Sequence, residues 1–300
     1  MVAPQAGITA AVSGRGGEEA LPLAGMAAAI GGIGGDGGAA GTFAAVGAGA
    51  FAEPCDRGCL LHVMQVYLDA LVAHDPSKLA TSPALTMTDN GVPAQPGDGL
   101  WNTATLLAVG ARLDFADPVT GNVATQCVIW EGSIPVIYGA RLNVEAGLIT
   151  EIESITVRRE DAANGLFEPA NLEPLPVFTR PPDPATRMTR DELLALQEVY
   201  LDYFEGDVNG RPVPFDESCT RYENGVVTDC GLPALRLQSR GLPVTRRVLI
   251  VDEEAGITFG MFPFMQTETA LVAGQAFKML HGKITMIQAI AAYMPSKAWN

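Results

Sequence analysis

Side chains suited to acid–base chemistry gather around the short motif Thr88-Asp89-Asn90-Gly91. Asp89 supplies a carboxylate and Asn90 an amide, while Asp98 and Trp101 add a second carboxylate and an aromatic wall nearby. In an apolar cavity the pKa of a carboxylate rises, so it can act as a general acid or base near neutral pH. The motif also has a plainer interpretation, because Asn and Gly accept positive φ in hairpin turns.

A second candidate pair lies upstream on a predicted helix. From Cys59 to His74, apolar residues recur every three or four positions, which is typical of one buried stripe. Tyr67 and His74 lie on that stripe and would supply a proton donor and a base facing a cavity. The alternative is a core tyrosine with a histidine that caps the helix C-terminus.

Polar and aromatic side chains on predicted strands form a third candidate set, for substrate binding. An arginine in a cavity can hold a carboxylate through two parallel hydrogen bonds. The alternative is that these side chains alternate outward into solvent. The set consists of Arg112, Gln126, Trp130, Tyr138 and Arg141.

The first motif has a counterpart in the second half of the chain, Glu223-Asn224-Gly225. Arg221 precedes it as an anion contact or an ion-pair partner, and Tyr200 occupies the position that matches Tyr67. Tyr200, Arg221, Glu223 and Asn224 therefore join the substrate-binding candidates. The hairpin interpretation applies to this copy as well.

Other landmarks repeat in the same order, at an offset of about 134 residues. They are Tyr-Leu-Asp at 67–69 and 200–202, an Asp-to-Gly turn at 117–121 and 252–256, and Gly-x-Ile-Thr-x-Ile at 147–152 and 282–287. We therefore interpret the chain as a tandem duplication of one α+β unit. The predicted domains are a Gly/Ala-rich tail at 1–54, a first unit at 55–160, a linker at 161–188 and a second unit at 189–300.

The elements that would position these residues follow from local patterns. In the first unit we expect helices at 59–74, 76–80 and 102–107, and strands at 84–88, 111–116, 122–131, 134–144 and 148–157. Six prolines between 160 and 188 argue against a helix or a central strand there. Thr189 and Glu192 form a capping box that begins the next helix.

The five cysteines indicate the cellular compartment in which the protein works. Cys219 and Cys230 lie symmetrically about the Asn224-Gly225 turn, so a two-residue hairpin would place them opposite each other. Cys55 and Cys59 are spaced for a bridge at a helix entrance, and Cys127 is left as a buried thiol. Two bridges predict an oxidising, secreted or extracytoplasmic location. A metal site built from Cys55, Cys59 and His62 is the alternative.

The first 54 residues are dominated by Gly and Ala. Ala50-Phe51-Ala52 resembles a signal cleavage site, but the only cation before it is Arg15. An export signal and a low-complexity tail both remain open. No uninterrupted apolar run is long enough to predict a membrane span.

Composition excludes several classes of function. The net charge is −15, and no cluster of Lys and Arg is present to bind nucleic acid. No phosphate-binding loop and no Gly-x-Ser-x-Gly elbow occur, and three histidines without a His-x-x-x-His pattern argue against catalytic zinc. No cofactor and no metal are therefore predicted.

A helix pair followed by antiparallel strands that end in Gly-x-Ile-Thr-x-Ile resembles the nuclear transport factor 2-like, or SnoaL-like, superfamily. The chain also resembles a largely uncharacterised secreted family of tandem cones. The stretches that carry this are Cys59, Tyr67-Leu68-Asp69-Ala70-Leu71, Asp89-Asn90-Gly91, Gly97-Asp98-Gly99-Leu100-Trp101, Arg221, Glu223-Asn224-Gly225, Val251-Asp252 and Met294-Pro295-Ser296-Lys297-Ala298-Trp299. The resemblance implies an α+β fold of two tandem cone-shaped domains, each with N-terminal helices packed on a curled antiparallel sheet.

The resemblance implies a polar cavity on the concave face of each sheet. The leading hypothesis is a cofactor-free acid–base enzyme, a lyase, dehydratase or isomerase acting on a small polar organic molecule. The alternatives are a non-catalytic small-molecule-binding module and a structural module. Interiors filled by side chains would argue against the enzyme. We also expect the halves to form an intramolecular pseudo-dimer, with a homo-oligomer as a further option.

Overall fold

The computed structural model describes residues 55–205, 212–231, 248–265 and 270–294. These residues belong to one compact unit. The expectations for the tail at 1–54 and for the terminal motif Pro295–Trp299 lie outside the described residues. No helix in the described part of the chain is long and apolar enough to cross a membrane.

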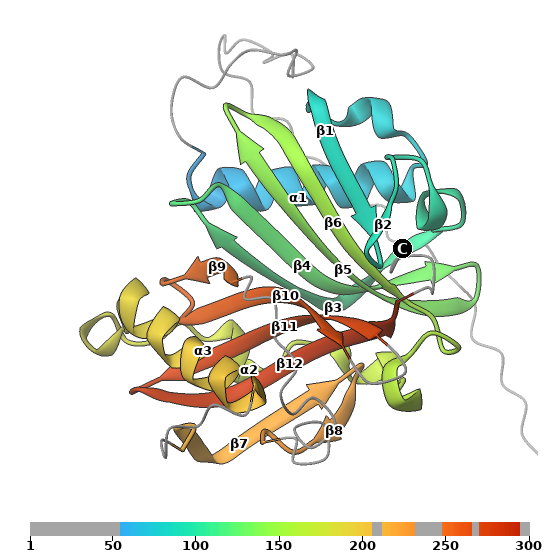
Figure 1. Cartoon of the computed structure of the whole chain (residues 1–300). Coiled ribbons are helices and arrows are strands. Elements are labelled where there is room, and N and C mark those ends of the chain that lie inside the picture. Colours follow the sequence, from blue (N-terminus) through green and yellow to red (C-terminus); the bar gives the residue numbers. More distant parts are fainter. Residues whose placement is uncertain (1–54, 206–211, 232–247, 266–269, 295–300) are drawn as a thin grey trace, which may run out of the picture. The chain divides into compact units, whose positions relative to one another are not determined.

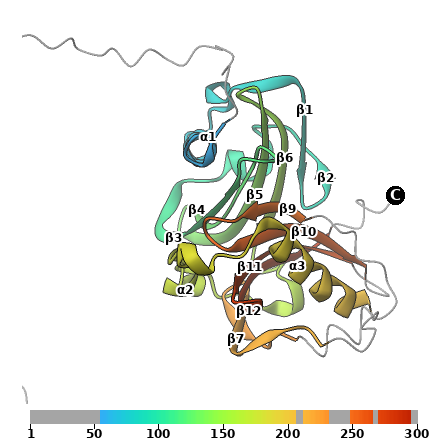
Figure 2. The same ribbon diagram turned by 90° about the vertical axis from the view of Figure 1, so that its left-hand side faces the viewer.

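The first half folds as one helix against one six-stranded sheet (Figure 1). Helix α1 (Arg57–Val72) and the 3-10 turn η1 (Pro76–Lys78) come first, and a second 3-10 turn, η2 (Gly99–Asn102), follows the β1–β2 hairpin. The strands are β1 (Thr81–Asp89), β2 (Val92–Pro93), β3 (Leu106–Asp117), β4 (Asn122–Glu131), β5 (Ile134–Glu145) and β6 (Leu148–Val157). Their order in the sheet is β2-β1-β6-β5-β4-β3. Figure 2 shows α1 end on beside these strands.

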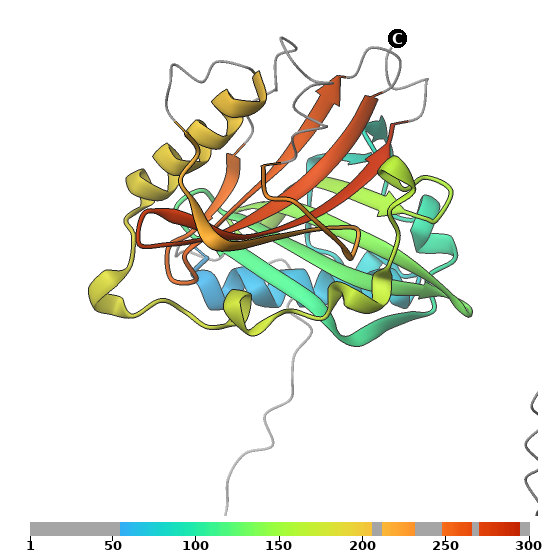
Figure 3. The ribbon, with the colours of Figure 1, turned by 90° about the horizontal axis from the view of Figure 1, so that it is seen from below.

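The second half repeats this plan. Helix α3 (Arg190–Glu205) runs beside a second six-stranded sheet (Figure 3). The strands are β7 (Phe215–Glu223), β8 (Val226–Thr228), β9 (Val248–Asp252), β10 (Ile257–Met265), β11 (Ala270–Leu280) and β12 (Lys283–Tyr293). Their order, β8-β7-β12-β11-β10-β9, matches the first sheet strand for strand. The prediction of two tandem α+β cones is confirmed, and we call each helix with its sheet the first and the second cone.

Strand direction differs from expectation in one respect. β1 runs parallel to β6, and β7 runs parallel to β12, whereas the other pairs are antiparallel. Each sheet is therefore mixed and open rather than wholly antiparallel. The cause is topological, because the first strand of each half lies beside the last one, and local patterns do not specify that partner.

Two local expectations in the first half are wrong. The expected helix at 102–107 is a 3-10 turn at Gly99–Asn102, and Leu106 already begins β3. The helix expected to reach His74 ends at Val72. There His74 adopts a positive φ of 56°, and the Asp75 and His74 amides bond the Ala70 and Leu71 carbonyls. This αL arrangement satisfies the last carbonyls and stops the helix.

The proline-rich segment forms only short turns. They are η3 (Ala163–Gly165), η4 (Pro169–Leu172), α2 (Pro176–Thr179) and η5 (Pro184–Thr186), and three of them begin with proline. Proline suits a first helical position because it has no amide hydrogen to leave unpaired there. The expected capping box is confirmed, since the Thr189 amide donates to Glu192 Oε2 at 2.8 Å. The domain boundaries themselves remain predictions.

The outer faces of the two sheets pack on each other. Phe115 of β3 stacks on Phe259 of β10 at 5.2 Å, within a buried cluster that contains Ile155 and Ile290. Two reciprocal ion pairs flank this core: Arg190 binds Asp117 at 2.8–2.9 Å, and Arg57 binds Asp252 at 3.0–3.2 Å. Each pair joins the helix start of one half to the sheet of the other, as in a pseudo-dimer.

Candidate functional site

A row of polar side chains lines the interior of the first cone. Tyr67 of α1 and Tyr138 of β5 share a hydrogen bond of 2.7 Å between their hydroxyls, and both rings are fully buried. Burial raises the pKa of both phenols, and a hydrogen bond with Ser154 offsets part of the rise at Tyr138. Ser154 of β6 in turn donates to Asp89 Oδ1 at 2.9 Å. The row therefore leads from the interior to the end of β1.

Asp89 is the titratable group at the outer end of this row. Its Oδ1 accepts hydrogen bonds from the Ser154 and Thr156 hydroxyls, at 2.9 and 3.0 Å. Burial raises the pKa of Asp89 above the usual range, and the two hydroxyl bonds only partly offset it. The side chain is nevertheless not sealed, because Asp89 keeps an intermediate exposure. Its Oδ2 faces Gly99, where a Cβ would lie 3.6 Å away.

Trp101 forms one wall beside this row. Its ring is 2% exposed and meets Tyr67 edge to face at a centroid distance of 5.6 Å. The short 3-10 turn Gly99–Asn102 holds it there, over the core that α1 makes with the inner face of the first sheet. The structure thus brings together three predicted residues, Tyr67, Asp89 and Trp101, with Tyr138 from the strand set.

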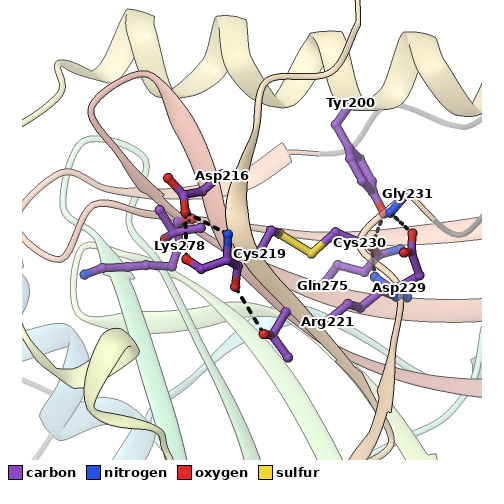
Figure 4. Close-up of a disulfide and its surroundings, with 12 residues drawn as sticks. Tyr200, Asp216, Cys219, Arg221, Asp229, Cys230, Gly231, Gln275 and Lys278 are labelled. Carbon is purple, nitrogen blue, oxygen red and sulfur yellow. Dashed lines mark hydrogen bonds between the residues drawn. A yellow bond between two sulfur atoms is a disulfide. The ribbon is translucent and has the colours of Figure 1, made fainter.

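In the second cone the equivalent acid, Glu223, has different partners. Strand register places Glu223 opposite Ala289, as it places Asp89 opposite Ser154. Alanines 289 and 291 supply no hydroxyls, and Glu223 instead binds Arg221 at 3.0 Å, with both side chains buried. Figure 4 shows Arg221 beside Gln275 and Tyr200, and burial raises the pKa of Tyr200 to about 12. The carboxylate of this half is therefore neutralised by an internal ion pair.

Asn90 and Asn224 extend the sheets with their side chains. Asn90 Nδ2 donates to the Thr156 carbonyl and Asn90 Oδ1 accepts from the Thr156 amide, both at 2.9 Å. Asn224 makes the same two bonds to Ala291 at 2.8 Å. Both residues have positive φ, 47° and 49°. The hairpin interpretation accounts for the hydrogen bonds that both side-chain amides make.

Two predicted catalytic residues lie apart from the row. His74 is exposed beyond the end of α1, and its Nε2 lies 2.6 Å from the Ala104 carbonyl oxygen. The expected pairing of His74 with buried Tyr67 along one helical stripe is therefore wrong. Asp98 is also exposed, and its Oδ2 accepts from the Gln95 amide at 2.9 Å, which shapes the loop before η2.

The strand set is divided between the two faces of the first sheet. Tyr138 faces the interior. Gln126 faces the second sheet, where its Nε2 donates to the Gly274 and Gln288 carbonyls at 3.0 and 3.3 Å. Arg141 is 2% exposed, but it binds Glu153 and Asn122 on the outer face rather than a cavity. Burial here comes from the second sheet, which alternation along a strand cannot reveal.

The other two members of the set are also at the periphery. Arg112 pairs with Asp114 at 2.9 Å on its own strand and contacts Gln65 of α1. Trp130 lines a surface pocket of about 410 Å³ together with Arg159 and Glu168. Neither residue reaches Asp89 through any contact seen here.

The cysteine prediction is confirmed. Cys55 bonds Cys59, and Cys219 bonds Cys230 across the β7–β8 hairpin, with Cα atoms 6.3 Å apart (Figure 4). The first bridge uses both sulfurs that the metal alternative with His62 needed. Cys127 is a buried free thiol, and burial raises its pKa to about 12, so it is a poor nucleophile.

Both interiors are filled by side chains. Trp101, Tyr67 and Tyr138 occupy the first, and Tyr200, Phe262 and Phe277 the second, each at most 2% exposed. The pockets found among the described residues lie on the outside, including one of about 640 Å³ between Leu175, Tyr222 and Thr285. A small molecule would therefore meet the first cone at its rim, where Asp89 is partly exposed.

Comparison with known protein families gives a match in the second half of the chain. A family model described as "Domain of unknown function (DUF8021)" matches residues 186–291. No curated protein matches the chain. The description of this family assigns no reaction, and the matched residues do not include the first cone.

Several solved structures are weakly similar. A protein of unknown function with a cystatin-like fold from Methylobium petroleophilum PM1 is 16% identical, with a TM-score of 0.31 over 39% of this chain and 86% of its own. A putative ketosteroid isomerase from Kribbella flavida DSM 17836 is 15% identical, with a TM-score of 0.28 over 37% and 85%. A putative polyketide cyclase from Silicibacter sp. TM1040 is 14% identical, with a TM-score of 0.27 over 34% and 90%. At these scores the likenesses carry no information about activity.

Proposed function

We propose that this chain is a cofactor-free acid–base enzyme, of the lyase, dehydratase or isomerase type, acting on a small polar organic molecule at the rim of the first cone. One observation carries the proposal. Asp89 is a partly exposed carboxylate whose pKa is raised by burial, and it stands at the end of a buried row of hydroxyl groups. Shifted carboxylates in such settings are the usual general acids and bases.

The geometry assigns different tasks to the two oxygens of Asp89. Oδ1 is held by Ser154 and Thr156, so Oδ2 is the atom left to accept a proton from the substrate. In an elimination, Oδ2 takes a proton from carbon, the C–H electron pair forms the new double bond, and hydroxide leaves from the neighbouring carbon. The proton on Asp89 then joins the hydroxide as water. In an isomerisation, the same proton returns to a different substrate atom.

The second cone would not share this chemistry. Glu223 is already bound by Arg221 in a buried ion pair at 3.0 Å, so its carboxylate has a charged partner in place of a substrate. We therefore place the reaction in the first half alone. Tyr67 and Tyr138 would assist the reaction by orienting the Ser154 hydroxyl that binds Asp89. Trp101 would form a wall on one side of the substrate.

A non-catalytic tandem-cone module is the second candidate. The filled interiors favour it, because enzymes of this kind usually enclose the substrate in a cavity. In that case the raised pKa of Asp89 would merely accompany hairpin structure. The two candidates make opposite predictions for turnover.

Turnover of a small-molecule mixture separates them. The purified chain is incubated with a polar metabolite extract, and mass spectrometry follows compounds that lose one water or change retention time at constant mass. For any compound consumed, Asp89→Asn should lower kcat/KM by about 10²–10⁴-fold, the usual contribution of a general base. Asp191→Asn, which removes an exposed carboxylate on α3, is the charge-matched control and should retain activity. An unchanged rate for Asp89→Asn would refute Asp89 as the general base, and no consumption by the wild type would favour the non-catalytic module.

We also propose that the chain works in an oxidising, extracytoplasmic compartment. The two disulfides support this, since cytosolic reductants keep most thiols reduced. Alkylation of intact cells and of their medium before any lysis, followed by peptide mapping, tests the idea. Labelled Cys219 and Cys230 in the native material would contradict it.

A further inference from the structure

A buried amide without partners lies in the second cone. Gln197 of α3 has no exposed surface, and neither its Nε2 nor its Oε1 meets a hydrogen-bond partner among the residues that the structure describes. Buried amides left in this state cost free energy, and natural cores rarely retain them. The repeat places Met64 at this position in the first cone. An apolar residue thus suits the position structurally, and the second half carries a polar one instead.

Two further polar atoms on the sheet opposite α3 are also unsatisfied. Arg221 Nη1 donates to Gln275 Oε1 at 3.1 Å and its Nη2 binds Glu223, but its Nε has no partner in the described part of the chain. The Thr258 hydroxyl, fully buried on β10, also has no hydrogen-bond partner among the described residues. Three separate elements, α3, β7 and β10, therefore contribute unpaired polar atoms to one interior.

Helix spacing and strand register place these groups on the interior of the second cone, with Tyr200 between them. Tyr200, one helical turn beyond Gln197, places its hydroxyl 3.4 Å from Gln275 Oε1, the atom that Arg221 also binds (Figure 4). Strand pairing sets Thr258 opposite Phe277, whose ring meets Tyr200 at 4.7 Å. The neighbouring inward positions are alanines 289 and 291, where the first cone has Ser154 and Thr156. The second cone thus lacks the hydroxyls that could satisfy its own polar atoms.

The character of the missing partner follows from charge and shape. Glu223 already balances Arg221, so the interior has no net charge to attract an ion. The Gln197 amide offers a donor and an acceptor side by side, which an amide or lactam edge complements with two hydrogen bonds. The surrounding rings of Tyr200, Phe262 and Phe277 favour a flat apolar body.

We propose that the second cone binds an uncharged small molecule that carries an amide or lactam edge on an apolar ring, with Gln197 as its principal hydrogen-bonding residue. Arg221 Nε and Thr258 Oγ1 provide further contacts. The interior is closely packed around Gln197, so binding requires neighbouring side chains to shift. This binding function is independent of Asp89, which lies in the other half.

Titration calorimetry on the full chain tests the proposal with 2-pyridone and benzamide as probes. Toluene, which has no polar edge, and benzoate, which is charged, are the comparison ligands. We expect the two amides to bind at least ten times more tightly than either comparison ligand. Equal affinity of toluene and benzamide would overturn the assignment, because the amide of Gln197 would then contribute nothing.

Two variants locate the site. Gln197→Met copies the first cone, so it should raise the Tm of the ligand-free chain and weaken 2-pyridone binding by at least ten-fold. Gln288→Met is the matched control, because Gln288 is buried on β12 and its amide nitrogen also lacks a partner in the described part of the chain. Alternation along β12 places it on the face of Ile290, which packs between the two sheets, and away from the face of Ile287, which packs with α3. The control should leave probe affinity unchanged. A higher Tm for Gln197→Met without amide binding by the wild type would show a strained core and refute the site.

A measurement on the wild type makes the conclusion independent of variant folding. The side-chain NH₂ resonances of Gln197, identified by their loss in Gln197→Met or by selective labelling, should shift when 2-pyridone is added. Shifts confined to residues outside the second cone would contradict the proposal, and so would an unchanged spectrum at saturating probe.

Discussion

Asp89 and Glu223 show how neighbouring side chains decide the partners of equivalent acids. They occupy equivalent positions in the two repeats, and each is the last residue of its strand. Asp89 is met by two hydroxyls and burial raises its pKa, whereas Glu223 is met by the Arg221 guanidinium. Met87 occupies the position of Arg221 in the first half. The change from Met87 to Arg221, with the loss of the Ser154 and Thr156 hydroxyls, therefore separates an acid bound by hydroxyls from one held in an ion pair.

The raised pKa of Asp89 predicts a pH dependence of stability. An acid whose pKa is higher in the folded state contributes stability below its unfolded pKa, about 3.9, and loses that contribution as pH rises through the folded value. Asp89→Asn removes the ionisation, so the variant should gain stability relative to wild type as pH rises from about 4 to 7. Urea unfolding at several pH values measures this. A constant difference between variant and wild type would mean that Asp89 titrates normally.

At the scale of elements, the β1–β2 and β7–β8 hairpins close by the same device. An asparagine at positive φ folds its side-chain amide back onto the last strand and adds two hydrogen bonds to the ladder. Asn224 is fully buried, while Asn90 is partly exposed. In the second hairpin the Cys219–Cys230 bridge reinforces the same turn.

Removing the amide should therefore cost more in the second hairpin. Asn224→Gly keeps the freedom for positive φ but leaves the Ala291 amide and carbonyl unpaired, at about 1–3 kcal/mol for each group. Asn90→Gly should cost less, because water can reach that turn. Urea unfolding of both variants gives the comparison. Equal losses, or a loss at Asn224 below that at Asn90, would argue against the role assigned to burial.

At the scale of the whole molecule, two carboxylates join the halves. Asp117 Oδ2 accepts from the Val251 amide at 3.1 Å, and Asp252 Oδ2 accepts from the Ala116 amide at 3.2 Å, so each caps the edge strand of the other sheet. Burial alone would raise the pKa of Asp117, but the bonds to Arg190 and Val251 outweigh it and hold the pKa below the usual range. The joint between the halves is thus reciprocal, like a dimer interface made within one chain.

Breaking one of these pairs should destabilise the joint. Arg190→Met leaves the buried Asp117 carboxylate without its cationic partner, with the Val251 and Val119 amides still bonded to it, and we expect a loss of about 2 kcal/mol or more in the free energy of unfolding at pH 7. Because the pKa of Asp117 is depressed, its contribution is present above the unfolded value of about 3.9 and disappears as pH falls, so wild type and variant should converge in acid. Arg112→Met, which opens a partly exposed pair within the first sheet, should cost at most about 1 kcal/mol. A difference between wild type and Arg190→Met that persists at low pH would contradict this account.

Local patterns in the sequence determined the units of this protein. Apolar periodicity placed α1, a capping box marked the start of α3, alternation placed β4, and the spacing of landmarks revealed the duplication. The symmetry of two cysteines about a turn predicted their bridge, because hairpin register depends only on nearby residues. Tyr67, Asp89 and Trp101 were recognisable as candidates because residue type and nearby motif are also local features.

Tertiary structure alone decided which of these candidates meet and what each can do. The parallel pairing of β1 with β6 brings Ser154 and Thr156 to Asp89 across some 65 residues of chain, and no local pattern encodes that partner. Packing of the two sheets took Gln126 and Arg141 out of the cone, because the outer face is buried here rather than solvated. Gln197 lies in the helix that the capping box predicted, but its lack of partners among the described residues depends on every element around it. The pKa and the hydrogen bonds of a side chain depend on the groups that surround it, and in this fold those groups come from distant parts of the sequence.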